Sequence, residues 1–428
     1  MELEEHLFRR ESGRIVSALT RIFGLENLAL AEDVAQDVFC RAVEVWKLRG
    51  IPQNPSAWLL KAAKNRAIDE LRRERTARKY ASELGRLLES EWTLVPTVND
   101  VFSAESIKDD ELRMMFSCCD GRLSEEAQVA LTLQLVCGFT TAEIASAFLG
   151  KRSTIEKRIA RGRRVLASSK RLFDLGDAEL QTRLSSVHRT LYLLFSEGYH
   201  GGSTENSVRR ELCREAMRLA ALLAENSLVS APVTNALCAL MWLHAARLPA
   251  RLSDSGDLLS LADQDRSRWD AALIAKGNEF LNRSASGEAL SEYHIEAAIA
   301  SLHSSASCTQ STDWARLVWL YDLLMRLRPS PVVALNRAIA VAQQKGPDRG
   351  LEAIRAISHG DRLASYPFFP AALGELELRA GRAQIAQKHL QTAAALARSP
   401  MERRFLKARF EAAVSAAASG DRGNCVSS

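Results

Sequence analysis

Basic side chains gather in two short helical segments, and the chemistry they offer is the binding of phosphate. Lys61–Lys79 holds eight Lys and Arg against three acidic residues, and Lys151–Arg171 holds nine against a single Glu. Their net charges, +5 and +8, together exceed the +5 of the whole chain, so the other residues are acidic on balance. Positive charge focused on helices suits a polyanion such as DNA. The alternative, two solvated helix faces, is the more common explanation of a lone basic run.

The composition predicts a soluble, mostly helical protein of two to four domains. Its 428 residues exceed what one hydrophobic core holds, and helix-favouring Ala, Leu and Arg are abundant. The most apolar stretch, Val233–Leu243, is shorter than the about 20 residues that span a bilayer, and it contains Asn235. The first residues, MELEEHLFRRE, lack the apolar centre of a signal peptide, so we expect a cytoplasmic protein.

The eight cysteines show no metal-binding or disulfide pattern. No Cys-x-x-Cys pair is present, and neighbouring Cys118 and Cys119 are poorly placed to ligate one zinc ion together. Seven of the eight lie in apolar helical contexts, where free Cys behaves as a small hydrophobe. We therefore predict no metal site. Without a Gly-rich phosphate loop or a nucleophile–base pair, we also predict no cofactor and no catalytic site.

Residues 1–80 have the pattern of consecutive amphipathic helices. A break, RGIPQNPSAWL, precedes a helix from Ala57 to about Arg78, which Asn54 or Ser56 is placed to cap. The apolar stripe of this helix consists of Leu59, Leu60, Ala63, Ala67, Ile68 and Leu71, whereas Lys61, Arg66, Arg72 and Arg73 lie largely off it.

An acidic amphipathic helix, LAEDVAQDVFCRAVEVW, precedes this basic helix. An acidic face beside a basic helix is unusual for a protein that binds only DNA, so the pattern suggests two partners, one of them a protein. Simple solvation is the alternative. The inner face is predicted to hold Val34, Val38, Ala42, Val45 and Trp46, and Glu32, Asp33, Gln36, Asp37, Arg41 and Glu44 lie wholly or partly outside it.

Residues 111–172 contain a helix-turn-helix frame, which follows a predicted acidic linker at 81–110. Thr140 and Thr141 are placed to cap the first helix, at 141–148, and the turn at 149–152 includes Gly150. An ordinary helical hairpin is the alternative. Ala145, Ile155 and Ile159 fall where the two helices must touch, and Ser153, Thr154, Lys157 and Arg158 would then face base edges, with Arg161, Arg163 and Arg164 facing phosphates.

Residues 173–428 are also predicted to be helical, with a weak repeat near 331–410. A generic helical bundle is the alternative to a repeat. The charged phrase DQDRSRW at 263–269 is more consistent with a structural role than with catalysis. The spacing of a tetratricopeptide unit is matched by Leu373, Gly374, Ala386, Leu390 and Ala393, and a helical pair at 331–344 and 348–357 places Ala353 33 residues before Ala386.

Several long motifs in fixed order resemble the sigma-70-type factors, and most closely their extracytoplasmic function (ECF) subfamily. AEDVAQDVF and NPSAWLLKAAKNRAIDELRR resemble region 2, and LSEEAQVALTLQLVCGFTTAEIASAFL with the basic helix after it resembles region 4. LYLLFSEGYHGGS, LADQDRSRWDAALIAKG and SPVVALNRAIAVA resemble an ECF branch with a long helical, tetratricopeptide-like C-terminal extension. The resemblance implies an all-α fold with region 2 at 1–80, a linker at 81–110, region 4 at 111–172 and the extension at 173–428.

The resemblance also implies three sets of site residues. Gln36, Asp37 and Arg41 match the helix that docks on the clamp helices of the largest polymerase subunit. Trp46 and Trp58 flank the −10 helix, either as core residues or as contacts of the exposed strand. The helix that engages and helps to melt the −10 element is matched by Asn65, Arg66, Asp69, Arg72 and Arg73. The helix that reads the −35 element is matched by Ser153–Arg164, with Ser153, Thr154, Lys157, Arg158, Arg161 and Arg164 as its candidates.

The chain departs from this family pattern at two places. Relatives of this branch commonly have an acidic turn where this chain has Gly150, Lys151 and Arg152, which adds charge at the reading end and is expected to alter promoter choice. His-Pro is usual near Asp120 and Gly121, in a loop to which we attach no function.

We therefore predict a non-enzymatic ECF sigma factor whose partners are core RNA polymerase and promoter DNA, with no membrane partner. A regulatory protein or a ligand is expected to act on the extension. Anti-sigma partners are typical of ECF factors in general, and control in cis by the extension is the alternative for this branch. One alternative is a helix-turn-helix activator with a helical-repeat sensor, which leaves residues 1–80 without a role. Another is an enzyme in the C-terminal half, which needs a concave polar pocket with titratable groups. A third, a pure scaffold, has no need of two basic helices.

Overall fold

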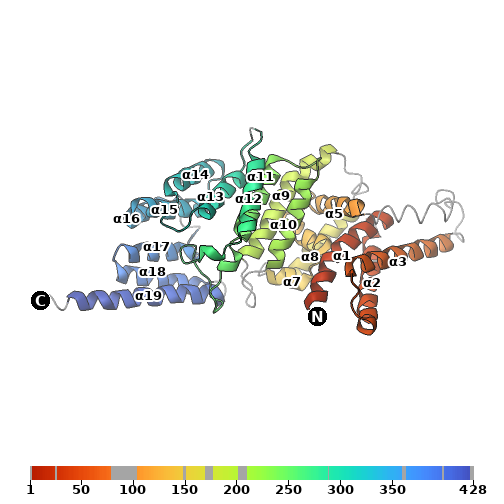
Figure 1. The fold of residues 1–428 in the computed structure, drawn as a ribbon, viewed down its shortest axis with the longest axis horizontal. Helices are drawn as coiled ribbons and strands as arrows, with labels where there is room; N and C mark the ends of the chain where they lie inside the picture. Colours follow the sequence, from red (N-terminus) through yellow and green to blue (C-terminus); the bar gives the residue numbers. More distant parts are fainter. Residues whose placement is uncertain are drawn as a thin grey trace. The chain divides into compact units, whose positions relative to one another are not determined.

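The computed structural model of the protein describes residues 2–24, 27–78, 104–147, 151–168, 177–200, 210–287, 289–358, 363–397 and 400–424. Helices supply the regular structure of these residues (Figure 1). The only β-type pairing among them is an isolated bridge between Leu252 and Leu258. The all-α fold class predicted from the sequence is therefore confirmed.

The chain divides into two compact units, which we describe separately. Unit 1 consists of Met1–Gly198 and Arg210–Val229, and unit 2 consists of Tyr199–Arg209 and Ser230–Ser428. The four segments predicted from the sequence divide the chain more finely, and their boundaries remain predictions.

Unit 1 contains both segments that resemble sigma regions. Residues 79–103, which hold most of the predicted linker, lie outside the described residues, and α5 begins at Ala104, within the predicted end of that linker. The helices of unit 1 are α1 (Glu2–Phe23), α2 (Leu28–Arg49), α3 (Pro55–Arg78), α5 (Ala104–Cys118), α6 (Glu125–Leu131), the π-helical segment η2 (Thr132–Val136), α7 (Thr141–Ala147), α8 (Arg152–Ala167), most of α9 (Asp177–His200) and α10 (Arg210–Glu225).

The start of α3 is set by a side-chain cap. The backbone N–H of Ala57 donates to the Oδ1 atom of Asn54 at 3.0 Å, which satisfies one of the unpaired donors at the helix start. The helix begins at Pro55, two residues before the predicted start. Ser56, the other candidate cap, donates instead to the buried carboxylate of Glu11 on α1 at 3.0 Å, and so joins α3 to α1.

The start of α7 has a reciprocal capping box, as the sequence led us to expect of Thr140. The hydroxyl of Thr140 accepts from the backbone N–H of Glu143 at 3.2 Å, and the Glu143 carboxylate accepts from the backbone N–H of Thr140 at 2.8 Å. The segment 148–150, which holds most of the predicted turn and Gly150, lies outside the described residues.

Helix α1 is central to unit 1, because it packs against α2, α3, α5 and η2. At Gly13 the two backbones approach so closely that a Cβ atom would lie 1.8 Å from the carbonyl oxygen of Val136 in η2. Arg21 of α1 also donates to the fully buried carboxylate of Asp110 on α5 at 3.1 Å. The three N-terminal helices and the helices that follow residue 104 therefore share one core.

Helices α9 and α10 extend this core beyond residue 172. The buried carboxylate of Glu111 on α5 accepts from both Nη atoms of Arg218 on α10, at 2.7 and 2.8 Å. Burial lowers the pKa of Arg218, but the charges of Glu111 and Glu215 raise it overall, so the guanidinium stays charged. Because the Glu111 carboxylate is out of water, its charge needs this partner.

Unit 2 is a succession of helix pairs, in which each α-helix packs against the next (Figure 1). Its helices are α11 (Pro232–Ala245), η3 (Leu248–Ala250), η4 (Arg266–Arg268), α12 (Ala271–Ser284), α13 (Glu292–Ser305), α14 (Trp314–Leu327), α15 (Pro331–Lys345), α16 (Pro347–Arg355), α17 (Phe368–Arg379), α18 (Ala383–Leu396) and α19 (Pro400–Asn424).

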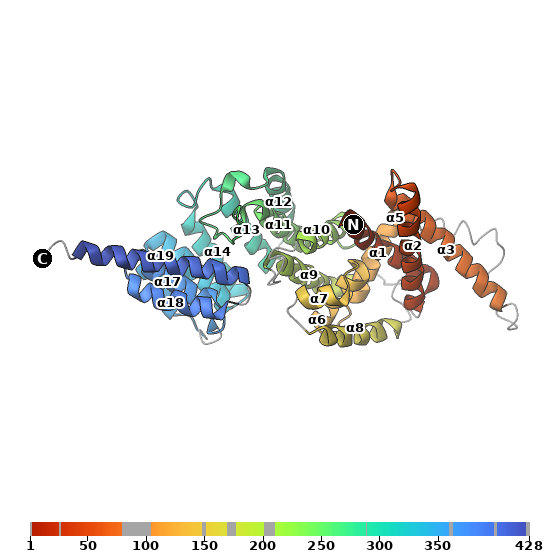
Figure 2. The ribbon, with the colours of Figure 1, turned by 90° about the horizontal axis from the view of Figure 1, so that it is seen from below.

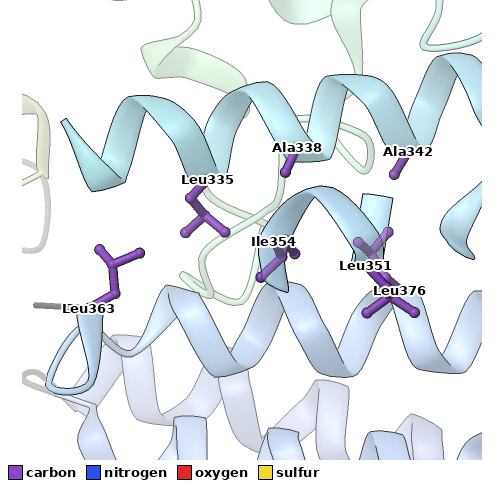
Figure 3. Close-up of a cluster of buried hydrophobic side chains, with 7 residues drawn as sticks. All are labelled: Leu335, Ala338, Ala342, Leu351, Ile354, Leu363 and Leu376. Carbon is purple, nitrogen blue, oxygen red and sulfur yellow. The ribbon is translucent and has the colours of Figure 1, made fainter. Parts of the chain in front are cut away.

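The helical pair predicted at 331–344 and 348–357 is present as α15 and α16. Figure 3 shows their buried side chains meeting those of α17, and the cluster consists of Leu335, Ala338, Ala342, Leu351, Ile354, Leu363 and Leu376.

The small residues predicted to form a repeat also lie at a helix crossing. A Cβ atom on Gly374 of α17 would lie 2.7 Å from Leu390 of α18, and Ala386 and Ala393 are buried on the same helix. Helix pairs with small residues at the crossing are what a tetratricopeptide-like extension needs. Its assignment as that repeat remains a prediction.

Replacing Gly13 by Ala is expected to lower the free energy of unfolding by about 1–3 kcal/mol, because the added methyl group would overlap the Val136 carbonyl. Urea unfolding followed by circular dichroism measures this loss. Gly121→Ala is the matched control, since nothing lies within 4 Å of a Cβ atom there. Equal stability of the two variants would contradict the close contact of α1 with η2.

Replacing Arg218 by Met is expected to cost about 3–5 kcal/mol of stability, because it leaves the Glu111 charge buried without its partner. Arg189→Met is the control, because Arg189 is as exposed as Arg218 but its partner Glu125 is 58% exposed. The loss of stability in this variant should be below about 1 kcal/mol. Thermal unfolding of both variants compares the two pairs, and similar losses would refute the importance of burial.

Candidate nucleic-acid interface

Helices α2 and α3 form a surface depression of about 470 Å³ in unit 1. Helix α2 buries Val34, Val38, Ala42 and Trp46, as its helical spacing predicts, and this leaves its acidic face toward solvent. The depression is lined by Asp37, Val38 and Arg41 of α2 and by Trp58, Lys61, Ala62, Asn65, Arg66 and Asp69 of α3.

The depression brings together residues that the sequence assigned to two different partners. Asp37 was predicted to contact polymerase and Arg66 to contact the −10 element, yet Arg66 donates to Asp37 at 3.4 Å and to Glu70 at 2.8 Å. Partial burial lowers the pKa of Arg66, but Glu70 and Asp37 raise it by more, so the side chain stays cationic. With exposed Asn65 and Asp69 beside it, this surface offers a cation, an amide and a carboxylate to one ligand.

Three predicted residues lie outside the depression. Gln36 is exposed on α2, and Arg72 and Arg73 are exposed further along α3. Arg73 lies 3.7 Å from Glu70, a weak contact for a side chain that is 70% exposed. All three are accessible, as contact residues must be, and their roles remain predictions.

The two tryptophans of this region occupy different environments. Trp46 is 4% exposed and lies in the core, with its ring 5.6 Å from that of Trp58 and 5.5 Å from that of Phe8. Trp58 is half-buried and lines the depression, where an aromatic ring can stack with an unpaired base. Lys61 also lines the depression, although it was not among the predicted DNA contacts. Its position outside the apolar stripe of the helix could have identified it as an exposed cation.

Helix α8 lies along one edge of unit 1 (Figure 2). It packs against α6 and α7, and Ala145, Ile155 and Ile159 are buried, as the predicted helix-turn-helix frame requires. On the outer face, Ser153, Thr154, Lys157, Arg161 and Arg164 are exposed and Arg158 is half-buried.

Arg163 differs from the other basic residues of α8. Its two Nη atoms donate to the Glu32 carboxylate of α2 at 2.6 Å each, and one also donates to Gln134 of η2 at 3.0 Å. The sequence placed Arg163 among the phosphate contacts, and this structure engages it in an ion pair that links α8 to α2. No local pattern signals this pair, because its partners lie 131 positions apart.

Three buried cysteines of unit 1 behave as apolar side chains, whereas Cys40 is exposed, contrary to an apolar environment for nearly all cysteines. Burial raises the pKa of Cys119 to about 11 and raises those of Cys118 and Cys137 well above their usual value, which keeps all three thiols neutral. Within the described ranges, no group of three His, Cys, Asp or Glu side chains is placed to hold a metal ion. The same residues include no helix long and apolar enough to cross a membrane.

Comparison with known families assigns most of the chain. Residues 7–77 match the family Sigma-70 region 2, and residues 113–166 match Sigma-70, region 4. Residues 183–285 match a family of unknown function, DUF6596. The Sigma-70 region 2 match covers α2 and all but the last residue of α3, and the region 4 match covers α7 and all but the last residue of α8.

Relatives fall into a full-length group and a partial one. An uncharacterized protein of Rhizobium meliloti is 34% identical over 397 residues, which is 92% of either chain. The ECF RNA polymerase sigma factor SigK of Mycobacterium ulcerans is 28% identical over 33% of this chain and 74% of its own length. SigK of Mycobacterium sp. (strain KMS) is 28% identical over 37% of this chain and 79% of its own length. No solved structure matches the chain.

Replacing Arg161 by Gln is expected to weaken binding to duplex DNA and to lower the slope of log K against log salt by about one, as the loss of one phosphate contact requires. Fluorescence anisotropy at several salt concentrations measures this slope. Arg163→Gln, on the same helix, is the control and should leave the slope unchanged, because Arg163 is paired with Glu32. An equal change in both variants would mean that this pair opens on DNA.

Proposed function

Because the chain belongs to the ECF subfamily of sigma-70-type factors, we propose that it binds core RNA polymerase, recognises −10 and −35 promoter elements and directs transcription initiation in the cytoplasm. Sigma factors are initiation factors and not enzymes, so the polymerase performs the chemistry. One observation carries the proposal: the depression between α2 and α3 and the exposed basic helix α8 occur in one chain, in the order of the family.

The −10 element would be held at the depression and along α3. Asn65 and Asp69 offer an amide and a carboxylate to base edges, and Trp58 offers a ring on which an unpaired base can stack. Arg72 and Arg73, exposed beyond the depression, are suited to phosphates of the separated strand.

The −35 element would be read by α8 in the major groove. Ser153 and Thr154 occupy its first turn, which enters the groove first in a helix-turn-helix complex. Lys157 and Arg158 follow one turn later, within reach of base edges. Arg161 and Arg164 are one further turn along and suit the phosphate backbone, which fixes the register of the helix.

Core polymerase would dock on the exposed acidic face of α2, at Gln36, Asp37 and Arg41. Asp37 is 64% exposed and shares Arg66 with Glu70, so a polymerase cation that paired with Asp37 would release one partner of Arg66. In this proposal polymerase binding frees a cation at the −10 surface. Such coupling suits a factor whose DNA binding depends on its polymerase.

Unit 2 would modulate the activity of unit 1. Most of unit 2 follows the sigma regions in the chain. Most of the DUF6596 match at 183–285 lies in unit 2, and all of it lies outside the two Sigma-70 matches. A helical-repeat surface suits the binding of a regulatory partner or ligand.

Run-off transcription with purified core polymerase on genomic promoter fragments is expected to give transcripts that require this protein. A chain that ends at Val229 tests unit 2, and its transcript level relative to the full chain gives the sign of the regulation. This end point keeps α10, and with it Arg218, the partner of buried Glu111. Failure of the full chain to bind core polymerase, together with sequence-specific binding of duplex DNA, would establish the activator alternative instead.

Charge reversal on α2 locates the docking surface in the same assay. Asp37→Lys is expected to weaken core binding by at least about tenfold, because like charges are brought together across the interface. Asp33→Lys, an exposed site on α2 outside the depression, should bind core polymerase normally. Equal binding of both variants would remove Asp37 from the docking surface.

A further inference from the structure

Unit 2 contains a cavity of about 1160 Å³ for which the proposed sigma function gives no role. One wall is the segment 260–266, which holds most of the charged phrase DQDRSRW. The end of α13 and the loop after it, with α14, α15, α17 and α19, supply the other walls. Its lining is amphipathic, since Trp314, Phe368 and Phe405 lie in it together with charged side chains.

Two polar side chains of the wall each bury one atom that has no hydrogen-bond partner. Gln264 is 7% exposed, and its Oε1 atom has no hydrogen-bond partner. His303 is 8% exposed, and its Nδ1 atom has none. Each of these groups costs free energy when it is left dry and unpaired. Because both side chains line the cavity, a bound ligand with matching polar atoms would satisfy them.

Three arginines lie at and behind this wall without carboxylate partners among the described residues. Arg266 lines the cavity and donates only to the carbonyl oxygens of His303 and Ala306, at 2.7 and 2.6 Å. Arg247 is 9% exposed, and its Nε atom has no partner. Arg251 contacts the ring of Tyr199, with its guanidinium carbon 4.0 Å from the ring centroid.

The aromatic ring of Trp269 joins two of these cations. The guanidinium carbons of Arg266 and Arg247 lie 5.0 and 5.6 Å from its centroid. The attraction between a cation and an aromatic ring is small beside the cost of burying an uncompensated charge. The ring therefore orients the guanidinium groups without neutralising them.

The carboxylates nearest in sequence are engaged elsewhere. Asp263 pairs with Arg409 on α19, and Asp265 accepts from the backbone and hydroxyl of Ser267. The wall thus combines uncompensated positive charge with unpaired polar atoms.

The electrostatics of the wall agree with this geometry. Burial, together with the charges of Arg247 and Arg266, lowers the pKa of His303 to about 4. Burial likewise lowers the pKa of Arg247, to which Arg251 adds, and none of the charges that shift either arginine is a carboxylate. Glu296 raises the pKa of Tyr321 but shifts neither arginine.

We propose that this cavity binds a small organic acid that also carries a hydroxyl or amine donor. The acid group lies against Arg266 and His303, and neutral His303 donates a hydrogen bond from Nδ1. Arg247, which does not line the cavity, adds to the positive electrostatic potential at the acid group. The Oε1 atom of Gln264 accepts a hydrogen bond from the hydroxyl or amine of the ligand, and the apolar part of the ligand contacts Trp314 and Phe405. The effect of this ligand on transcription rests on the proposed regulation by unit 2. The binding itself does not, because it is measured separately.

Isothermal titration of the full chain with 4-hydroxybenzoate tests the site, since this probe joins an acid, an apolar ring and a hydroxyl. We expect saturable binding at one site with a Kd on the order of 1 mM or tighter. Its uncharged amide, 4-hydroxybenzamide, should bind at least about tenfold more weakly. Equal binding of acid and amide, or no saturable binding of the acid at about ten times that concentration, would overturn the proposal.

Two variants separate a binding role from a structural one. Arg247→Met should raise the melting temperature of the ligand-free chain, because it removes an unpaired buried charge, yet reduce the preference for acid over amide by about tenfold. Arg268→Met is its control, since Arg268 is exposed and paired with Asp254. Gln264→Leu should abolish the advantage of 4-hydroxybenzoate over benzoate. Unchanged preferences in both variants would refute the assigned contacts.

Transcription distinguishes the failure of this inference from that of the proposed function. If the probe binds but neither raises nor lowers run-off transcription by the full chain, the site stands and regulation through it fails. If transcription requires the protein but the probe does not bind, the sigma function stands and this site does not.

Discussion

The close contact of α1 with the π-helical segment η2 is the constraint on which unit 1 depends. At Gly13 the two backbones are so near that no side chain fits between them. Helix α1 also packs against α2, α3 and α5, so the helices before the linker and those after it share one core. The helix that carries the −10 candidates and the helix that carries the −35 candidates are therefore parts of one packed body.

Ion pairs reinforce this packing where helices distant in sequence meet. Glu32 on α2 holds Arg163 of α8, and Asp110 on α5 holds Arg21 of α1. A pair that includes a buried carboxylate has to be kept, because either charge alone would remain out of water. Under the proposed function, binding of both promoter elements has to keep this arrangement or open it. The Glu32–Arg163 pair, in which both side chains are partly exposed, costs less to release than a pair with the buried Asp110.

Unit 2 contains a buried charge that is not balanced by an opposite one. The buried carboxylates Glu111 and Asp110 of unit 1 and Glu377 of unit 2 have cationic partners, whereas Arg247 of unit 2 is buried and has no carboxylate partner among the described residues. An unpaired charge lowers the stability of a folded protein, and such groups concentrate where a ligand completes the site. The wall that holds it faces a cavity lined by both aromatic and charged side chains, as ligand sites commonly are.

Local spacing in the sequence determined the helices, the apolar face of α2, the cap at Asn54 and the charge on α8, since each depends on residues within a few turns of one another. The long sequence motifs also indicated the family to which the chain belongs. Only the tertiary structure decided that Asp37 meets Arg66 and that Arg163 pairs with Glu32. It also decided that Arg247 and Arg266 lie by one cavity wall with no carboxylate partner among the described residues. These pairings join segments tens of residues apart, and burial decides whether a charge is solvated or needs a partner, which no local pattern encodes.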